Sequence, residues 1–345
     1  MEPASPPAKL DARRRSASDF AELARVVRQA GLLDRRPGRY AVRVGLTLTA
    51  LGGGWIVFVS LGDTWWQLLT AVFLAVVWAQ VSFIGHDAGH KQIFRGRRAN
   101  DAVGLVHGGL VGLSYGWWVA KHSRHHANPN HEHDPDLDIP ILAFTAGQGR
   151  AKRGFSRWTV KYQAYLFFPL LLLEGASLHW SSVDAAWRGE MRRRGLEKTL
   201  LVTHGVAYFA AAFLVLSPGK ALVFIAVHQG LWGLYMGCSF APNHKGMPTA
   251  TDDEGWDFLR KQVLTSRNVC GGRWVDTALG GLNYQIEHHL FPSMPRPNLR
   301  RARPVVQAFC AAHGIAYHET GLLRSYGDVL RHLHAVGAPL RASAR

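Results

Sequence analysis

The sequence predicts an all-α integral membrane protein, with four transmembrane helices in two hairpins and a cytoplasmic helical cap. Composition is the first reason, because 48% of the 345 residues are hydrophobic while the mean hydropathy is only −0.04. The apolar residues must therefore be concentrated into blocks. The second reason is that four blocks approach the roughly 20 residues needed to cross a bilayer core. The third is the charge, which is unevenly distributed between the connecting segments.

The four apolar blocks form two pairs, and each pair is joined by a short polar turn. Gly62 and Asp63 separate the first two blocks, and the segment from Ser217 to Lys220 separates the last two. So short a turn returns the chain to its starting side, which predicts two helical hairpins. The blocks are Tyr40–Leu61, Thr64–Phe83, Leu200–Leu216 and Ala221–Phe240.

The net charge of +16 comes from 40 Lys and Arg against 24 Asp and Glu. Basic runs precede the first hairpin, at Arg13–Arg15 and Arg35–Arg43, and lie between the hairpins, at Lys91–Arg98, Arg150–Lys161 and Arg188–Lys198, whereas the two turns contribute only Lys220. Positive loops favour the cytoplasm, so both termini and the central region are expected there. Membrane orientation accounts for the basic excess, and we expect no nucleic-acid binding.

Two further apolar stretches, Ala102–Ala120 and Tyr162–His179, are interrupted by glycine, proline and charged residues. Such interruptions favour helices that lie in the membrane interface, so four true spans and two surface helices are expected. The predicted organisation is a cytoplasmic N-terminal segment over residues 1–39, a membrane domain over 40–335 and a tail over 336–345. Within the first segment, Phe20–Leu33 predicts an amphipathic helix on the membrane, and no secretory signal is present.

Three histidine clusters lie just beyond apolar stretches. Residues three or four apart share one face of a helix, so each cluster can direct its imidazoles at one point. Seven imidazoles exceed what one ion takes from a protein, which predicts two metal ions, and imidazole suits iron, copper, zinc or nickel. In the third cluster Gln285 stands where a first histidine would be. The seven histidines are His86, His90, His122, His125, His126, His288 and His289.

Other polar residues stand beside these clusters. His244, at the end of the fourth apolar block, has the membrane depth of the clusters and is expected to be an eighth ligand, with Asn243 beside it. The carboxylates of Asp87 and Glu287 are expected to hydrogen-bond the ligand imidazoles. Asp134 and Asp136 are further candidates, and solvated loop charge explains each carboxylate equally well.

The motifs H-x-x-x-H, H-x-x-H-H and Q-x-x-H-H between two membrane hairpins resemble those of the membrane fatty acid desaturases. The likeness covers about Tyr40 to Leu333, and its most specific part is Leu282–Pro292. The glutamine of the third motif is similar to that of the front-end, linoleoyl-CoA desaturase-like branch, and of bacterial acyl desaturases grouped with it. The resemblance implies that the seven histidines and His244 bind two iron ions, with Gln285 as a weak or water-mediated contact.

The resemblance also implies an activity. An O2-dependent desaturase would use two external electrons to introduce a cis double bond into a fatty acyl chain, carried by coenzyme A or a lipid. Many front-end enzymes carry a fused cytochrome b5 domain, whereas the forty or so residues before the first apolar block contain no histidine to bind its heme. A separate electron donor, a ferredoxin or similar protein with its reductase, is therefore expected, at a bacterial plasma membrane.

The acyl chain needs an apolar channel that reaches the metal ions. Aromatic residues near the motifs are candidates for its walls, although such residues are also common at membrane interfaces. Three alternatives to a desaturase remain open: a histidine-motif hydroxylase or ketolase, a metal transporter or sensor, and a structural protein with inert zinc. The candidate channel residues are Tyr115, Trp117, Trp118, Trp232 and Tyr235.

Overall fold

The structure, a computed structural model, describes residues 19–251 and 255–342. Helices make up nearly all of the regular structure in these ranges, so the predicted all-α class is confirmed. The exception is a parallel pair of three-residue strands, β1 (Asn268–Cys270) and β2 (Glu319–Gly321), in which Asn268 lies opposite Glu319. The first 18 residues of the predicted N-terminal segment lie outside the described residues.

The chain divides into two compact units, each assembled from separate stretches of sequence. We call Arg35–Ser123 with Tyr165–Phe240 the membrane unit. The terminal unit comprises Met1–Asp34, Arg124–Ala164 and Ala241–Arg345. Both of the predicted hairpins fall within the membrane unit, apart from the last four residues of the final helix.

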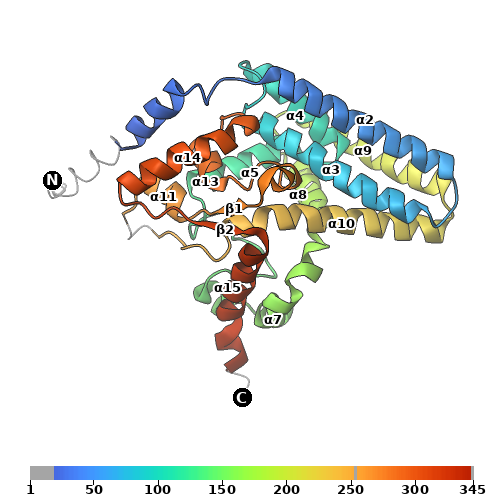
Figure 1. Ribbon diagram of the computed structural model, residues 1–345. Helices are drawn as coiled ribbons and strands as arrows, with labels where there is room; N and C mark the ends of the chain where they lie inside the picture. The colour runs from blue at the N-terminus through green and yellow to red at the C-terminus, as the bar shows by residue number, and fades with distance from the viewer. Residues whose placement is uncertain (1–18, 252–254, 343–345) are drawn as a thin grey trace. The chain divides into compact units, whose positions relative to one another are not determined.

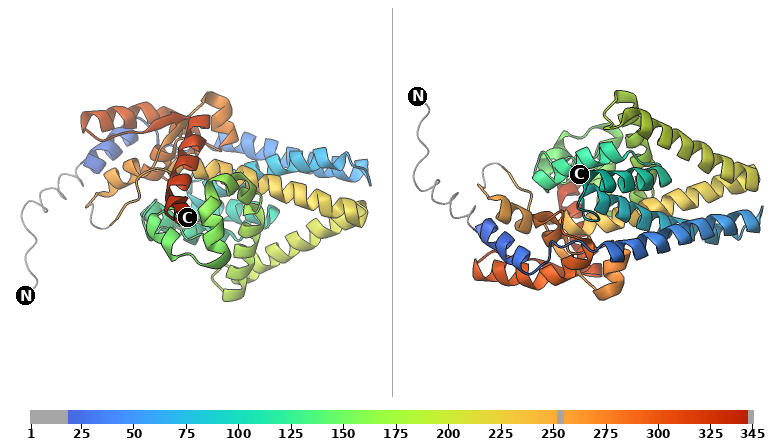
Figure 2. Two further views of the ribbon diagram at one scale, coloured as in Figure 1. Left: turned by 90° about the horizontal axis from the view of Figure 1, so that it is seen from below. Right: turned by 90° about the horizontal axis from the view of Figure 1, so that it is seen from above.

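The membrane unit contains the two helical hairpins, α2 with α3 and α9 with α10 (Figures 1 and 2). These four helices are long and apolar enough to cross a membrane, which confirms the four predicted spans. Helices α7 and α8 meet the same criteria only as a pair, and they are bent by 82°. The helices are α2 (Pro37–Leu61), α3 (Gln67–Gly89), α4 (Arg97–Leu110), α8 (Glu174–Arg188), α9 (Arg194–Val215) and α10 (Pro218–His244), with parts of α5 (Tyr115–Ala127) and α7 (Gly154–Leu171).

The interior of the membrane unit is organised around Trp78, which is only 1% exposed. Its ring centroid lies 4.4 Å from that of His228, 5.4 Å from Trp232 and 5.6 Å from Tyr208. The hydroxyl of Tyr208 and Nδ1 of His228 are hydrogen-bonded at 2.8 Å. Nδ1 of His228, a histidine inside a span, thus has a polar partner within an aromatic core, as burial of polar groups favours.

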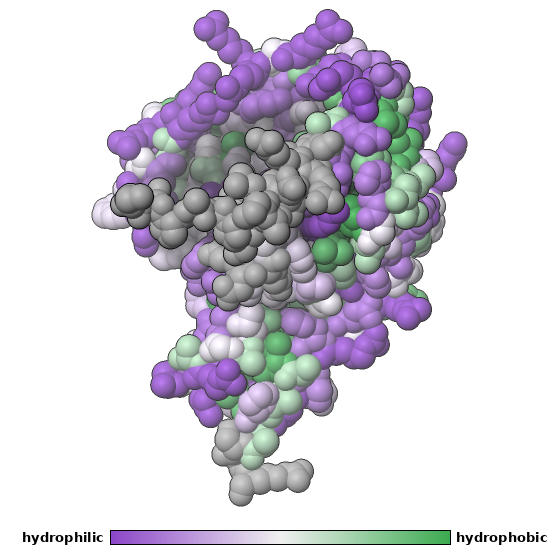
Figure 3. Space-filling model, turned by 90° about the vertical axis from the view of Figure 1, so that its left-hand side faces the viewer, coloured by the Kyte–Doolittle hydropathy of each residue, from purple (hydrophilic) through white to green (hydrophobic). Residues whose placement is uncertain are grey.

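The terminal unit is built from short helices around its own apolar core. The helix over residues 19–29 is amphipathic, but its apolar face packs on protein rather than lying on a membrane as expected, since Leu23 and Val27 are fully buried against Ile286 and Val306. On the face drawn in Figure 3, hydrophilic residues line the upper edge. Its helices are α6 (Ala146–Ala151), α11 (Phe258–Leu264), α12 (Gly272–Ala278), α13 (Gln285–Leu290), α14 (Arg296–Ala312) and α15 (Leu322–Ala342).

The first turn of α5 is fixed by a buried carboxylate from α9. Ser114 precedes the helix, and its hydroxyl accepts a hydrogen bond from the Trp117 N–H at 3.2 Å, as an N-cap residue does. Glu197, only 2% exposed, accepts hydrogen bonds from the Ser114 hydroxyl at 2.7 Å and from the Gly116 N–H at 2.9 Å. Because α5 carries the second histidine cluster, these contacts fix the start of the helix that positions the cluster.

The end of α10 is fixed by a buried guanidinium. Arg267 is 1% exposed, donates to the backbone carbonyls of Pro242 and Lys245, and forms an ion pair with Asp328 at 3.1 Å. A cation at this position satisfies carbonyls that have no partner within the helix and complements the helix dipole. The contact holds the last turn of α10, and with it His244.

The close contact between Gly104 and Tyr115 gives a test of packing in the membrane unit. A Cβ atom at Gly104 would lie 2.1 Å from Cε2 of Tyr115, whose hydroxyl is held by Lys91 and Asp101. We expect Gly104→Ala to lower the free energy of unfolding by about 1–3 kcal/mol, as overpacking does, measured by thermal unfolding in detergent. Gly52→Ala is the control, since its Cβ would meet nothing within 4 Å. Equal unfolding temperatures for the two variants would contradict this packing.

Candidate metal centre

Three of the eight candidate ligands form a group in the membrane unit. His86 lies in the last turn of α3, His90 is the residue that ends it, and His122 comes from α5. The ring centroids of His86 and His90 are 4.6 Å apart, and His122 lies 5.1 Å from the first and 4.8 Å from the second. The first cluster and the first histidine of the second cluster are therefore close neighbours.

Trp118 packs against all three rings of this group. It stacks on His122 with centroids 4.6 Å apart and planes inclined by 22°, and its centroid lies 5.4 Å from His86 and 6.3 Å from His90. A Cβ atom at Gly89 would lie 2.5 Å from Cζ3 of this tryptophan. The glycine in the first motif thus provides the space that the indole occupies.

The other five candidate ligands form a second group in the terminal unit. One ring nitrogen each from His125, His244 and His289 lies within 4.8 Å of the others. The ring of His126 stacks on His289 at 4.2 Å and lies 4.8 Å from His288. All five side chains are buried. The boundary between the units falls inside α5, so this one helix carries ligands of both groups.

Three histidines of the second group use Nδ1 for hydrogen bonds with the protein. His125 contacts the Asp134 carboxylate at 2.9 Å, and His244 contacts the backbone carbonyl of Thr265 at 3.0 Å. His289 contacts Oε1 of Gln262 at 2.9 Å. Such bonds fix which nitrogen carries the proton and leave Nε2 with a lone pair for a metal ion.

The positions of two Nε2 atoms test whether a metal ion fits. Carbonyl oxygens can only accept hydrogen bonds, so Nδ1 of His244 and Nδ1 of His289 both carry the proton. Their Nε2 atoms therefore both present lone pairs, yet they lie 3.2 Å apart. Lone pairs this close repel unless a positive charge faces them, and a metal ion bound by both provides it. The residues of this group thus fit a metal ion with imidazole ligands.

The electrostatics of the group also suit metal binding. Burial and the neighbouring imidazoles hold the pKa of His289 well below its ordinary value, so the ring is neutral. At His125 burial opposes protonation, but the carboxylates of Asp136 and Asp134 prevail and raise its pKa. Only neutral imidazole binds a metal, and hydrogen bonding to a carboxylate makes it a stronger donor.

Gln285 lies at the point where these ligands converge. Its Nε2 is 2.9 Å from Nε2 of His244, and its Oε1 accepts a hydrogen bond from Nδ2 of Asn243 at 3.2 Å. Asn243 therefore orients the glutamine amide, which in turn faces the metal-directed nitrogen of His244. This geometry is compatible with the expected weak or water-mediated contact.

The two predicted carboxylate partners differ in position. Asp87 is buried, and its Oδ1 is 3.4 Å from Nδ1 of His86. Glu287 instead accepts hydrogen bonds from the Tyr317 hydroxyl at 2.7 Å and from Nδ2 of Asn268 at 2.8 Å. Burial raises the pKa of Glu287 to about 7. Its contacts anchor α13 rather than a ligand ring.

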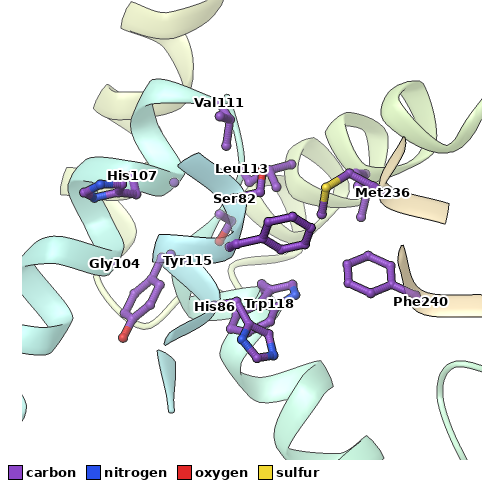
Figure 4. A pocket seen from close by; sticks show the side chains of 15 residues that line it. Ser82, His86, Gly104, His107, Val111, Leu113, Tyr115, Trp118, Met236 and Phe240 are labelled. Carbon is purple, nitrogen blue, oxygen red and sulfur yellow. The ribbon is translucent and has the colours of Figure 1, made fainter. Parts of the chain in front are cut away.

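An apolar pocket in the membrane unit reaches the first histidine group. Figure 4 shows His86 beside Trp118 at one end of it, with Met236 and Phe240 along another side. Of the five predicted channel residues, Tyr115 and Trp118 line this pocket. The other three do not: Trp117 flanks Trp118, Trp232 packs on Trp78, and Tyr235 accepts a hydrogen bond from Gln80. The remaining lining residues are Ser82, Phe83, Gly85, Gly104, His107, Gly108, Val111, Leu113, Ser114 and Leu178.

Comparison with known proteins shows similarity to several desaturases. The chain is similar to the acyl-lipid (9-3)-desaturase of Physcomitrium patens, with 34% identity over 286 residues, 78% of this chain and 53% of that protein. It is 32% identical over 339 residues to fatty acid desaturase 3 of Bos taurus, covering 92% and 73%. A Delta 8-(E)-sphingolipid desaturase of Emericella nidulans is 30% identical over 326 residues, covering 86% and 58%.

The chain thus spans about half the length of the Physcomitrium patens protein and about three quarters of the Bos taurus protein. The model of the family described as fatty acid desaturase matches residues 63–321, which include all eight candidate ligands and three of the four spans, α3, α9 and α10. Together with the eight clustered histidines and the four spanning helices, this match shows that the chain belongs to the fatty acid desaturase family.

Proposed function

We propose that the protein is a membrane-bound diiron acyl desaturase. The iron ligands would be the eight histidines, of which His86, His90 and His122 belong to the membrane unit and His125, His126, His244, His288 and His289 to the terminal unit. The single observation that carries this proposal is the 3.2 Å approach of Nε2 of His244 to Nε2 of His289, with Nδ1 of each ring facing a carbonyl oxygen. Gln285 and Asn243 complete the polar surroundings of the second group.

Bound iron would supply the O2-dependent oxidation of unactivated methylene groups, which lies beyond any side chain acting as acid or base. The overall reaction balances when one –CH2–CH2– unit, one O2, two electrons and two protons give a cis –CH=CH– unit and two waters. The chain's own residues fix the ring directions through their Nδ1 hydrogen bonds. The apolar pocket beside His86 excludes water from the reacting carbons.

The substrate follows from the lining of the pocket. Apolar side chains such as Met236, Phe240 and Val111 suit a hydrocarbon chain, and Trp118 would bring that chain against the first histidine group. The names of the relatives refer to acyl-lipid, fatty acid and sphingolipid desaturases. We therefore assign a long-chain acyl group as the substrate, carried by a lipid or by coenzyme A.

Orientation and electron supply complete the proposal. The positive loops favour a cytoplasmic position for the termini and the histidine groups. Exposed arginines of the terminal unit, including Arg273, Arg300 and Arg301, suit an acidic electron carrier such as a ferredoxin. The basic surface is assigned to these two roles and not to nucleic acid. A bacterial plasma membrane stays a prediction.

Expression in a host that lacks the product tests the proposed reaction. We expect new acyl chains two mass units lighter than their precursors, detected by mass spectrometry of host lipids, with iron bound to the purified protein. A gain of one oxygen atom would instead identify a hydroxylase or ketolase. Bound zinc without O2 consumption would contradict both kinds of oxidase.

The histidine assignment is tested by His289→Ala. Removal of this ligand should abolish double-bond formation and lower the iron content. The protein should remain in the membrane fraction, since the four spans are unchanged. His334→Ala is the matched control, because His334 is exposed on α15. Product at the wild-type level from His289→Ala would rule out the assigned group.

The pocket is tested by Met236→Phe. Met236 is 4% exposed and lines the pocket, so a larger ring shortens the space available to the acyl chain. We expect kcat/KM for the longest accepted chain to fall about 10-fold or more, the effect of a methylene-sized misfit, while shorter chains and iron content change little. Leu214→Phe, 85% exposed on α9, is the control. Equal losses for all chain lengths would contradict this placement of the substrate.

A further inference from the structure

Gln262 on α11 is a fully buried glutamine that uses both ends of its amide. Its Nε2 donates to the backbone carbonyl of His126 at 3.1 Å, and its Oε1 accepts from Nδ1 of His289 at 2.9 Å. Because a carbonyl can only accept, the first bond fixes the orientation of the amide. Gln262 therefore presents oxygen, and not nitrogen, to His289.

We infer that Gln262 is a positioning residue for the second histidine group, an inference that rests on the proposed function. It holds the proton of His289 on Nδ1, so that Nε2 is free for the metal ion. It also connects the second motif to the third, since one amide contacts the backbone of His126 and the ring of His289. Nothing in the histidine motifs themselves indicates this residue.

The three imidazoles fixed in this way have chemically different partners. His125 is paired with the carboxylate of Asp134, His244 with a backbone carbonyl, and His289 with a neutral amide. A carboxylate partner strengthens an imidazole donor more than a neutral partner does. The amide of Gln262 thus fixes the direction of His289 without adding negative charge to a group that already contains Asp134.

A second glutamine in the same unit provides the comparison for a purely structural role. Gln163 is also fully buried and uses both ends of its amide, accepting from the Ala143 N–H at 3.0 Å and donating to the carbonyls of Ala143 and Leu333 at 2.9 and 3.1 Å. Its hydrogen bonds go to backbone atoms of residues other than histidine. Replacing it removes similar hydrogen bonds and burial without altering a ligand.

The test compares Gln262→Met, Gln262→Glu and Gln163→Met in the full-length protein, purified in detergent. Iron content, the visible spectrum after loading with Co2+, and the unfolding temperature are measured for each. Methionine keeps the length of glutamine but has no strong acceptor, so Gln262→Met should weaken metal binding about 10- to 100-fold, as loss of such a partner does, and change the Co2+ spectrum. Gln163→Met should lower only the unfolding temperature.

Gln262→Glu keeps an acceptor for His289 but loses the donor to His126. It should keep the wild-type iron content, with a Co2+ spectrum shifted by the stronger donor that a carboxylate partner makes of His289, at a lower unfolding temperature. A wild-type spectrum for Gln262→Met, or equal metal loss in Gln163→Met, overturns the inference. If Gln262→Met does not accumulate, Gln262→Glu decides: iron at the wild-type level with a shifted spectrum supports the role, and an unchanged spectrum or a loss of iron overturns it. Altered Co2+ spectra combined with no desaturation by the wild-type protein would instead contradict the proposed function alone.

Discussion

The rest of the structure depends on one electrostatic constraint, the approach of two imidazole lone pairs. Nε2 of His244 and Nε2 of His289 come within 3.2 Å because each ring is committed through Nδ1 to a carbonyl oxygen. Two neutral acceptor nitrogens repel each other at this distance, so the surrounding protein must hold them there. That requirement explains why rigid, buried partners surround the group, where solvent-exposed side chains would let the rings rotate apart.

Short elements with little regular structure of their own supply that rigidity. Helix α11 is seven residues long and α13 is six, yet they carry Gln262 and the third motif. Isolated helices of this length are unstable, so tertiary contacts hold them. Asn268 at β1 donates to Glu287 and accepts from the Ile286 N–H, and these two hydrogen bonds hold α13 in place. The ion-paired Arg267 performs the same task for the end of α10.

The sequence was sufficient to predict the spans, because the length of an apolar block can be compared directly with the thickness of the bilayer core. Helices α2, α3, α9 and α10 lie where the apolar blocks predicted them. It also identified the histidines, which the structure arranges in two groups. It could not identify Gln262 or Thr265, whose partners lie 27 and 21 residues away and follow no helical repeat. The helix over residues 19–29 was misplaced on the membrane because amphipathicity does not distinguish a lipid surface from a protein core.

The contacts of Glu197 join a helix start to a residue that is synthesised much later. Its contacts to Ser114 and Gly116 bridge 83 and 81 residues of chain. On the ribosome, the second histidine cluster therefore emerges long before the carboxylate that secures the start of its helix. Until Glu197 has been synthesised, the Ser114 hydroxyl and the Gly116 N–H lack their carboxylate acceptor. The start of the helix that carries the second histidine cluster is therefore completed only after the chain of the third span has begun to emerge.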